Sequence, residues 1–276
     1  MKTLFLRNSL LFLFAITCCK PESDTIPSGI VSLSPSITKE IIDLGAEELL
    51  AGVTSYHPPL SRKVEIIGSI TVPNFEKILL LKPDIVLFSE EDGSTQPLKP
   101  LEASGLRLHK FGRNKNFSDI CANYIELGKI IGKESEARSK AALYASALSA
   151  AKRGGRGVSV LVLISHEPLI TASGLSFIGQ MITDAGGKNI FDDAGIPYPI
   201  VSAEAIVHRD PDAVIIMSEG GTESFSKSFS RFSMRALKNG ALFKIEPEHI
   251  AYYTPADYAD AVKDFTLIFD SLKPKQ

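Results

Sequence analysis

The sequence contains no tryptophan and only three cysteines in 276 residues. Two of these, Cys18 and Cys19, are adjacent, so Cys121 is their sole possible partner and no disulfide framework can hold the fold together. The 30 basic residues nearly balance the 32 acidic ones, and no long basic cluster occurs, which argues against a nucleic-acid surface. With 44% hydrophobic residues, the chain can bury one large core or two moderate ones.

Motifs of common enzyme classes are also missing. The sequence has no G-x-S-x-G, no P-loop, no H-E-x-x-H and no complete G-x-G-x-x-G. Ser173, His166 and Asp184 can be drawn as a triad, but their spacing marks no strained nucleophile turn. We therefore predict that the protein is not an enzyme, and keep an exported hydrolase or an adhesive lipoprotein as alternatives of other classes.

The apolar run near the start is too short to span a bilayer. It covers residues 10–16, follows two basic residues and is typical of a signal-peptide core. The run ends at two cysteines and then turns polar, which resembles a bacterial lipoprotein signal. We predict a signal peptide over 1–18, lipidation of Cys19, with Cys18 as the alternative, and a tether over 19–28. Two acyl chains would then hold the exported protein on a membrane surface.

Short β-rich runs alternate with helical patterns along the rest of the chain, which predicts parallel βαβ units. The runs begin at Ile30, Leu49, Glu65, Asp84, Leu106, Val158 and Asp212. Residues 114–153 contain no proline and repeat apolar residues at helical spacing, so we expect one long helix there, with a kink near Gly132. The predicted fold is α/β, with two Rossmann-like lobes over 29–113 and 154–276 joined by that helix and a ligand cleft between them. Residues 174–185 form an amphipathic stretch, and a final helix is predicted over about 256–272.

One sequence motif occurs twice, once in each predicted lobe. The stretches are NFEKILLLKPDIVLF, from Asn74, and SAEAIVHRDPDAVII, from Ser202. In each, a capping residue precedes a first-turn glutamate, Glu76 or Glu204, where the helix dipole favours a carboxylate. Pro-Asp then ends the helix and begins a strand. On local physics alone, the copies are explained as two recurring βα units.

A further helix is predicted from phenylalanines at i, i+4 and i+7. Phe225, Phe229 and Phe232 are interpreted as its core face, and Lys227, Arg231 and Arg235 as its solvated side.

Over nearly all its mature length the chain resembles a known family. IVSLSPSITKEIIDLGAEELLAGVTSYHPP, VPNFEKILLLKPDIVL and DAGGKNIFDDAGIPYPIVSAEAIVHRDPDAVII are similar to the substrate-binding proteins of ABC importers for cobalamin, haem and iron siderophores. Within that family, TSYHPP, GKNIF, IPYP and VSAEAI resemble the cobalamin-binding members. The resemblance implies two lobes bridged by a rigid helix, a ligand in the cleft between them, and periplasmic localisation.

The resemblance also implies a partner, the permease dimer of an ABC importer. In the family, one acidic residue on each lobe pairs with permease arginines, and the matching positions are Glu76 and Glu204. We expect a monomer that presents these two carboxylates to a two-fold symmetric permease.

The expected ligand residues lie in loops that follow strands, where open α/β sheets bind ligands. They are Tyr56, His57, Ser89, His166, Tyr198 and Tyr253. Tyr56 matches a cleft tyrosine of the cobalamin-binding pattern. Cleft tryptophans of that pattern are replaced by Ile70, Ser89 and Tyr198, which reduces the stacking area and leaves another ligand open.

The histidines provide the alternative ligand. His166, in LISHEP, resembles a haem-ligating histidine of some family members, and Tyr56 or His57 could approach from the other lobe. A hydrogen-bonded cleft or core residue is the simpler interpretation of His166. A bare metal ion would need three or four converging ligands, and only His57, His166 and His249 fall near predicted cleft loops. Cobalamin or a related corrinoid is therefore the expected ligand, with haem or a ferric siderophore as the alternative, and no catalytic cofactor is predicted.

Overall fold

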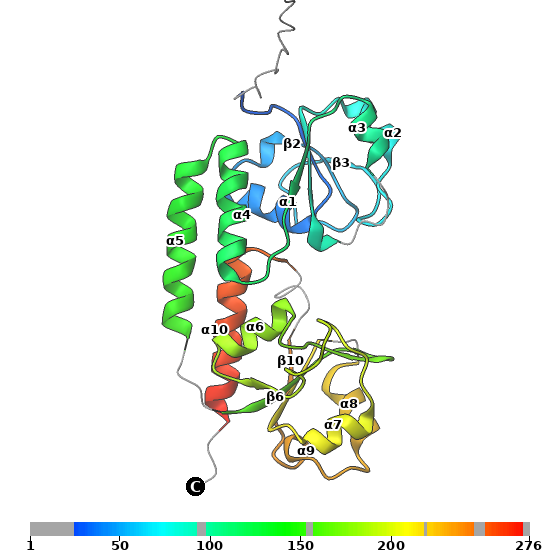
Figure 1. Cartoon of the computed structure of the whole chain (residues 1–276), viewed down its shortest axis with the longest axis vertical. Coiled ribbons are helices and arrows are strands. Elements are labelled where there is room, and N and C mark those ends of the chain that lie inside the picture. Colours follow the sequence, from blue (N-terminus) through cyan, green and yellow to red (C-terminus); the bar gives the residue numbers. More distant parts are fainter. Residues whose placement is uncertain (1–24, 93–97, 153–156, 218–219, 246–251, 273–276) are drawn as a thin grey trace, which may run out of the picture.

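The computed structural model describes residues 25–92, 98–152, 157–217, 220–245 and 252–272. These residues form two sheets, one in each half of the chain. Three helices lie along one side of the molecule: α4 (Phe117–Ile130), α5 (Glu134–Ala151) and α10 (Pro255–Ser271) (Figure 1). The expected α/β fold with two lobes is confirmed.

The first lobe is built on a parallel sheet with strand order β3-β2-β1-β4-β5 among the described residues. Its strands are β1 (Ile30–Ser32), β2 (Leu50–Val53), β3 (Glu65–Ile66), β4 (Ile85–Ser89) and β5 (Leu108–Phe111). Its helices are α1 (Pro35–Asp43), α2 (Phe75–Leu81) and α3 (Lys99–Ala103), with short 3-10 turns η1 (Glu47–Leu49) and η2 (Glu90–Asp92). Ile30 and Val31 are both fully buried because helices cover both faces of such a sheet.

The second lobe has strand order β10-β9-β6-β7 in the described part of the chain, with β8 paired to the start of β6. Its elements are β6 (Ser159–His166), β7 (Leu169–Thr171), α6 (Phe177–Asp184), β8 (Lys188–Asn189), α7 (Ala203–Arg209), β9 (Ala213–Ile216), α8 (Gly221–Phe229), α9 (Arg235–Lys238) and β10 (Leu242–Lys244). β7 runs antiparallel to β6, and His166 pairs with Leu169. A two-residue connection can join only antiparallel strands, so this hairpin departs from the expected βαβ pattern.

The single helix expected over 114–153 is wrong. α4 ends at Ile130 and α5 begins at Glu134, and Gly132 between them has a φ of 73°, a left-handed conformation that glycine adopts without strain. The two helices lie side by side (Figure 1). Gly128 permits the close approach, since a Cβ there would lie 2.5 Å from Ala137 Cβ. Apolar residues recur at helical spacing in both helices. The sequence pattern therefore does not show that the chain reverses direction between them.

α4 and α5 both join the lobes: Ile120 of α4 packs into the core of the second lobe and Tyr124 of α4 into that of the first, and α5 does the same. Ala137 and Ala141 in the first half of α5 pack into the core of the first lobe, whereas Leu148 near its end packs into the core of the second. Eighteen residues of helix span about 27 Å, enough to reach both cores. Lys140 Nζ and Tyr144 Oη of α5 each lie 3.0 Å from the Asp43 carboxylate of α1, which fastens the helix to the first lobe.

The two copies of the repeated motif contain equivalent helices, α2 and α7. The Asn74 side chain accepts the Lys77 N–H at 3.0 Å, and Ser202 accepts the Ala205 N–H at 3.1 Å, so both helices have the expected N-cap. Each helix ends in a left-handed residue that is not glycine, with φ of 47° at Lys82 and 40° at Asp210. The two copies therefore share their start, their length and their unusual end.

The Pro-Asp pair that follows each helix fixes two neighbouring strands together. Asp84 accepts hydrogen bonds from Ser28 N at 2.7 Å and Ser28 Oγ at 2.8 Å, just before β1. Asp212 accepts from Ser159 N at 3.0 Å and Ser159 Oγ at 2.7 Å, at the start of β6. In both lobes the aspartate thus joins the strand it begins to its parallel neighbour, which gives the repetition a structural cause.

The C-terminal copy has an extra partner that the sequence did not reveal. Arg235, expected to be solvated, donates from Nε to Asp210 Oδ2 at 2.9 Å and from Nη1 to Asp212 Oδ1 at 2.5 Å. Arg235 is exposed, as expected, but it begins α9 instead of continuing α8 and pairs with two aspartates. The expected core face is confirmed for Phe225 and Phe229, which are 0% and 2% exposed, whereas Phe232 lies beyond the end of α8 and is partly buried against the same core.

Candidate functional site

Residues from both lobes gather where the strands of the first sheet end. β2 leads into residues 54–59, β4 into η2, and β5 into residues 112–116. Three cavities lined by described residues lie at these loops. The carboxyl ends of parallel strands are the usual ligand position in open α/β sheets, and these cavities form the candidate site.

The aromatic cavity lies between the lobes and has a volume of about 670 Å³. It is lined by Glu91, Arg113, Asn114 and Lys115 of the first lobe and by Gly174, Leu175, Ser176, Phe177, Gln180, Ile196, Pro197, Tyr198 and Tyr253. Its size is within the range of small-molecule sites. The first lobe thus contributes charged and amide groups, and the second contributes most of the apolar wall.

Tyr253 and Tyr198 organise the aromatic wall. The Tyr253 ring packs edge-on against Phe177, with centroids 4.6 Å apart, and its backbone N–H donates to Ser36 Oγ at 3.0 Å across the lobes. Burial, together with Tyr253 alongside, raises the pKa of Tyr198, and burial raises the pKa of Tyr253. Both hydroxyls are therefore neutral hydrogen-bonding groups on a stacking surface at physiological pH.

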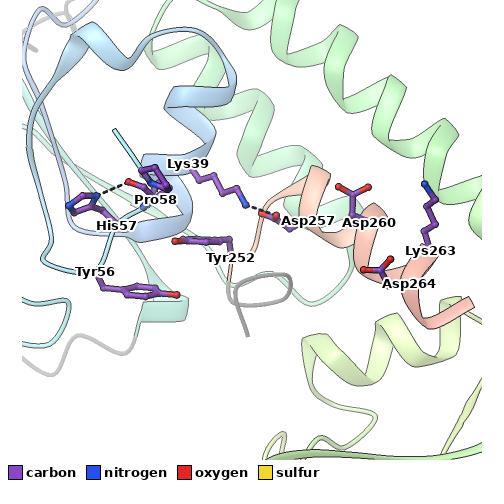
Figure 2. Close-up of a pocket in the computed structure, with 10 residues that line it drawn as sticks. Lys39, Tyr56, His57, Pro58, Tyr252, Asp257, Asp260, Lys263 and Asp264 are labelled. Atoms are coloured by element: carbon purple, nitrogen blue, oxygen red, sulfur yellow. Dashed lines mark hydrogen bonds and ion pairs between the residues drawn. The ribbon is translucent and has the colours of Figure 1, made fainter. Parts of the chain in front are cut away.

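The α10 cavity is separated from the aromatic cavity by the Tyr252-Tyr253 segment and has a volume of about 770 Å³. Its lining consists of Lys39, Tyr56, His57, Pro58, Pro59, Tyr252, Asp257, Asp260, Lys263 and Asp264. Figure 2 shows Tyr56 and Tyr252 facing each other, with the acidic side chains along α10. The two rings are nearly parallel, at 12° and 6.0 Å between centroids, and 45% of Tyr56 is exposed. A flat exposed aromatic surface of this kind can stack on a planar ligand.

The charges of the α10 cavity are partly paired across the lobes. Lys39 Nζ of α1 lies 2.6 Å from Asp257 Oδ1 and 4.5 Å from the centre of the Tyr252 ring (Figure 2). Asp260 and Asp264 are three and seven residues further along α10, so they lie on the same side of the helix as Asp257. The cavity carries more carboxylates than ammonium groups.

The polar pocket is small, about 20 Å³, and lies behind the aromatic cavity. It is lined by Ser34, Ser36, Ile37, Glu40, Ser89, Glu91, Phe111, Asn114, Asn123 and Tyr253. Glu91, Asn114 and Tyr253 line both spaces, so the two adjoin. A pocket of this volume holds a group about the size of one water molecule.

Three carboxyl groups at or beside the polar pocket have raised pKa values. Burial, and then the charges of Asp43 and Asp257, raises the pKa of Glu40 well above its ordinary value. Burial raises the pKa of Glu91, although the Asn114 N–H, which donates to Glu91 Oε1 at 2.6 Å, works against this. Burial also raises the pKa of Asp92 to about 6. The first lobe thus presents weakly acidic groups at the base of the cleft.

The residues predicted from the sequence separate into three places. Tyr56 and His57 line the α10 cavity, whereas Ser89, Tyr198 and Tyr253 line the polar pocket or the aromatic cavity. His57 Nδ1 lies 2.7 Å from the Pro58 carbonyl; because a carbonyl only accepts, this nitrogen carries the proton.

His166 lies apart from them. It lines none of these three cavities, and its Nε2 lies 3.0 Å from Ser228 Oγ of α8. This placement agrees with the hydrogen-bonded interpretation and gives no support to a haem ligand at His166.

Sequence reasoning missed several lining residues. Lys39, Glu40 and Asp257 lie inside helices, where a charged residue gives no local sign of facing a cavity. Thr254 caps α10, because its Oγ1 accepts the Asp257 backbone N–H at 3.1 Å, and such a Thr-x-x-Asp pattern is read first as a helix start. An acidic i, i+3, i+7 stripe on the final helix was the available signal.

Glu76 and Glu204 both lie exposed in the first turns of α2 and α7, away from the cavities. Hydrogen bonds from its own backbone N–H and from Ser202 lower the pKa of Glu204, so this carboxylate is charged at neutral pH. The geometry thus leaves both groups accessible to a partner.

Two lobes with cavities between them at their strand ends define a two-lobed ligand-binding protein. The chain belongs to the periplasmic binding protein family, whose model matches residues 30–248. It is 26% identical over 260 residues to a vitamin B12-binding protein of Vibrio vulnificus, covering 92% of each chain. It is 29% identical over 198 residues to a vitamin B12-binding protein of Pectobacterium carotovorum, covering 69% of this chain and 71% of the relative.

Solved structures share the fold. The periplasmic vitamin B12 binding protein BtuF of Vibrio cholerae matches with a TM-score of 0.79 and 21% identity, over 90% of this chain and 99% of that one. The periplasmic haem binding protein HutB of Vibrio cholerae matches with a TM-score of 0.77 and 21% identity, over 87% and 98%. At 21% identity, these two matches show a shared fold and nothing further.

The described residues contain no helix long and apolar enough to cross a membrane. Within the same residues, no three His, Cys, Asp or Glu side chains gather in a way that could hold a metal ion. The predicted signal peptide and Cys19 lie outside the described residues.

Proposed function

We propose that this protein is the lipid-anchored substrate-binding component of an ABC importer, which captures cobalamin or a related corrinoid between its lobes and delivers it to a permease. The observation that carries the proposal is the pair of cavities on either side of Tyr252-Tyr253, walled by aromatic residues and by hydrogen-bonding groups from both lobes. A large macrocycle needs flat apolar faces for stacking and a few polar groups for orientation. The vitamin B12-binding relatives support the same ligand class.

The charges favour a corrinoid over an anionic macrocycle. A corrin ring carries amide side arms, which donate hydrogen bonds, and carboxylates line both cavities: Asp257, Asp260 and Asp264 in one and Glu91 in the other. Haem carries two carboxylates, and these would be repelled by the same groups. A haem alternative is supported by Arg113 and Lys115, which could pair with such carboxylates in the aromatic cavity.

Ligand identity is tested by mixing purified protein with cobinamide, cobalamin and hemin, removing free ligand and recording the absorbance spectrum. We expect retained corrinoid. Retention of hemin with a shifted Soret band, and of no corrinoid, would instead establish the haem alternative. Retention of neither would contradict the proposed function.

The cleft is tested by substitution. Tyr56→Ala and Tyr198→Ala should each weaken corrinoid binding by about 1–3 kcal/mol, measured by titration calorimetry, because each removes an aromatic contact. Leu267→Ala is the control, since this exposed apolar residue of α10 lines neither cavity. His166→Ala should leave corrinoid affinity unchanged. Equal affinity in the tyrosine variants would place the ligand elsewhere.

The anchor is tested separately from the ligand. Cys19→Ser should abolish palmitate labelling and release the protein from the membrane fraction, because no acyl chain can then be attached. Cys18→Ser is the matched control and should remain anchored. The reverse result would make Cys18 the modified residue, and unchanged labelling in both variants would contradict the lipoprotein proposal.

A further inference from the structure

The polar pocket is lined by buried polar groups, one of which has no well-formed hydrogen bond. Ser34 is 0% exposed and Glu40 is 5% exposed, and both line the pocket. Ser34 Oγ makes no hydrogen bond of good geometry within the described part of the chain; its polar neighbour is the Asp92 carboxyl beside the pocket, whose pKa the Ser34 hydroxyl lowers. Buried polar atoms normally have partners, because leaving one unpaired costs about 1–3 kcal/mol. The exception here faces a cavity that can admit a partner.

The pocket adjoins the cavity in which the proposed ligand would lie. Three of its lining residues, Glu91, Asn114 and Tyr253, also line the aromatic cavity. A group attached to a macrocycle in the aromatic cavity can therefore reach Ser34 and Glu40 through this shared wall. The pocket's volume of about 20 Å³ limits the entering group to the end of a side arm.

The chemistry of the lining residues determines which chemical group of a ligand can enter the pocket. The oxygens that line the pocket belong to a serine hydroxyl and to carboxyl groups, each of which can accept a hydrogen bond from an N–H donor. Burial raises the pKa of Asp92 only to about 6, so its carboxyl is mainly anionic at pH 7.5. An incoming carboxylate would face like charge in a poorly hydrated space, whereas an amide N–H₂ would find acceptors.

We propose that the pocket formed by Ser34, Glu40, Ser89 and Glu91 is a specificity subsite that accepts an amide side arm of the macrocycle and rejects a carboxylate at the same position. The subsite rests on the proposed function, since it needs a macrocycle in the aromatic cavity. Ser34 and Glu40 would be the specificity-determining residues at its closed end, and Glu91 at its mouth.

The test compares matched ligands that differ by one group. Cobinamide is titrated against its separated monocarboxylic acids, each with one amide arm converted to a carboxylate, at pH 7.5. We expect one isomer to bind roughly tenfold to a hundredfold more weakly than the amide, because the subsite loses a donor and gains a like charge. Should the protein retain hemin and no corrinoid, hemin and hemin diamide form the equivalent pair, and the diamide should bind more tightly.

Substitutions locate the effect. Glu91→Gln should reduce the discrimination between the two ligands roughly tenfold, and Ser34→Ala should weaken the amide ligand alone. Glu90→Gln is the control: this neighbouring carboxylate is exposed, pairs with Lys110 at 2.6 Å and lies outside the pocket. Glu91 is only partly buried, so its variant keeps the test valid where a Glu40 variant fails to fold.

Equal affinity for the amide and for every carboxylate isomer would overturn the subsite while leaving the proposed function standing. Discrimination that persists unchanged in Glu91→Gln and Ser34→Ala would also overturn it. If no macrocycle binds, the proposed function itself fails, and the subsite falls with it.

Discussion

The two lobes solve one structural problem in the same way and then differ in what they place at the cleft. In both, a capped helix of seven residues carries an exposed glutamate, ends in a left-handed residue and is followed by an aspartate that joins two parallel strands. The first lobe completes this unit with Ser28 and the backbone N–H of Gly29, whereas the second adds the Arg235 side chain. A repeated backbone arrangement therefore does not require repeated side-chain support.

At the cleft the lobes contribute different chemistry. The first supplies buried carboxyl and hydroxyl groups, including Glu40 and Ser34, from α1 and the end of β4. The second supplies Phe177 and Tyr198 from α6 and the segment before α7. Similar lobes can thus orient a ligand from one side and stack on it from the other.

The largest expected effect tests whether the two helices act as a pair. Replacing both Glu76 and Glu204 with Ala should nearly abolish uptake, whereas either single change should reduce it roughly tenfold, because each leaves one partner charge unpaired at an interface. Ligand affinity should stay unchanged, since both residues lie away from the cavities. Uptake in cells and binding to reconstituted permease are measured side by side.

Salt provides the control for that pair. Binding of the unaltered protein to permease should weaken as salt rises, because screening shortens the reach of the carboxylates, and the double variant should lose this dependence. Wild-type uptake by the double variant would mean that the two glutamates do not dock the permease and that the repeated motif is only structural.

The buried carboxyls of the first lobe should make stability depend on pH. The folded-state pKa of Asp92, about 6, is above its ordinary value, so the folded state holds more protons and stability falls as pH rises from about 4 to 6. Asp92→Asn should stabilise the protein by about 1–2 kcal/mol at pH 7.5 and have little effect at pH 4. Urea unfolding at both pH values measures this, and equal effects at the two would contradict it.

Arg235 should be the residue that distinguishes the two repeated units energetically. Arg235→Ala should lower the free energy of unfolding by about 1–2 kcal/mol, a value reduced for partial exposure, because Asp210 and Asp212 both lose a charged partner. Lys227→Ala, on the exposed side of α8, is the matched control and should change stability by a few tenths of a kcal/mol, roughly. A loss no larger than the control's would mean that the second lobe needs no extra support.

The smallest effect concerns the left-handed residues that end α2 and α7. Lys82→Gly should stabilise the protein by about 0.5–1 kcal/mol, because glycine adopts a φ of 47° without strain. Asp210→Gly relieves similar strain but removes the carboxylate that binds Arg235, so it should destabilise. Thermal unfolding of both variants measures whether each substitution raises or lowers the stability. If both raise it, the Asp210 side chain contributes little to the stability.

Much of the fold followed from short-range signals. Asn74 and Ser202 indicated helix starts, and apolar runs at Ile30, Asp84 and Val158 indicated strands, all of which the structure confirms. The reversal at Gly132 was missed because one glycine ends a helix without altering the apolar spacing on either side. The hairpin of β6 and β7 was missed because its second strand has only three residues, too few to show the alternation of a strand.

The candidate site followed less completely. Tyr56, Tyr198 and Tyr253 were identified because they lie in loops after strands or resemble family motifs, and they line the cavities. His166 also follows a strand, but its side chain meets α8, and loop position does not fix side-chain direction. Asp260 and Asp264 were missed because helical charges are usually solvated.

The sequence by itself determined the two repeated units, the caps, the strands and the class of fold, because each of these depends on residues a few positions apart. Tertiary structure decided which side chains share a cavity. Lys39 and Asp257 meet at 2.6 Å although 218 residues separate them, and Tyr253 meets Ser36 across 217. Such contacts depend on how α5 and α10 set one lobe against the other, and no local pattern encodes that distance.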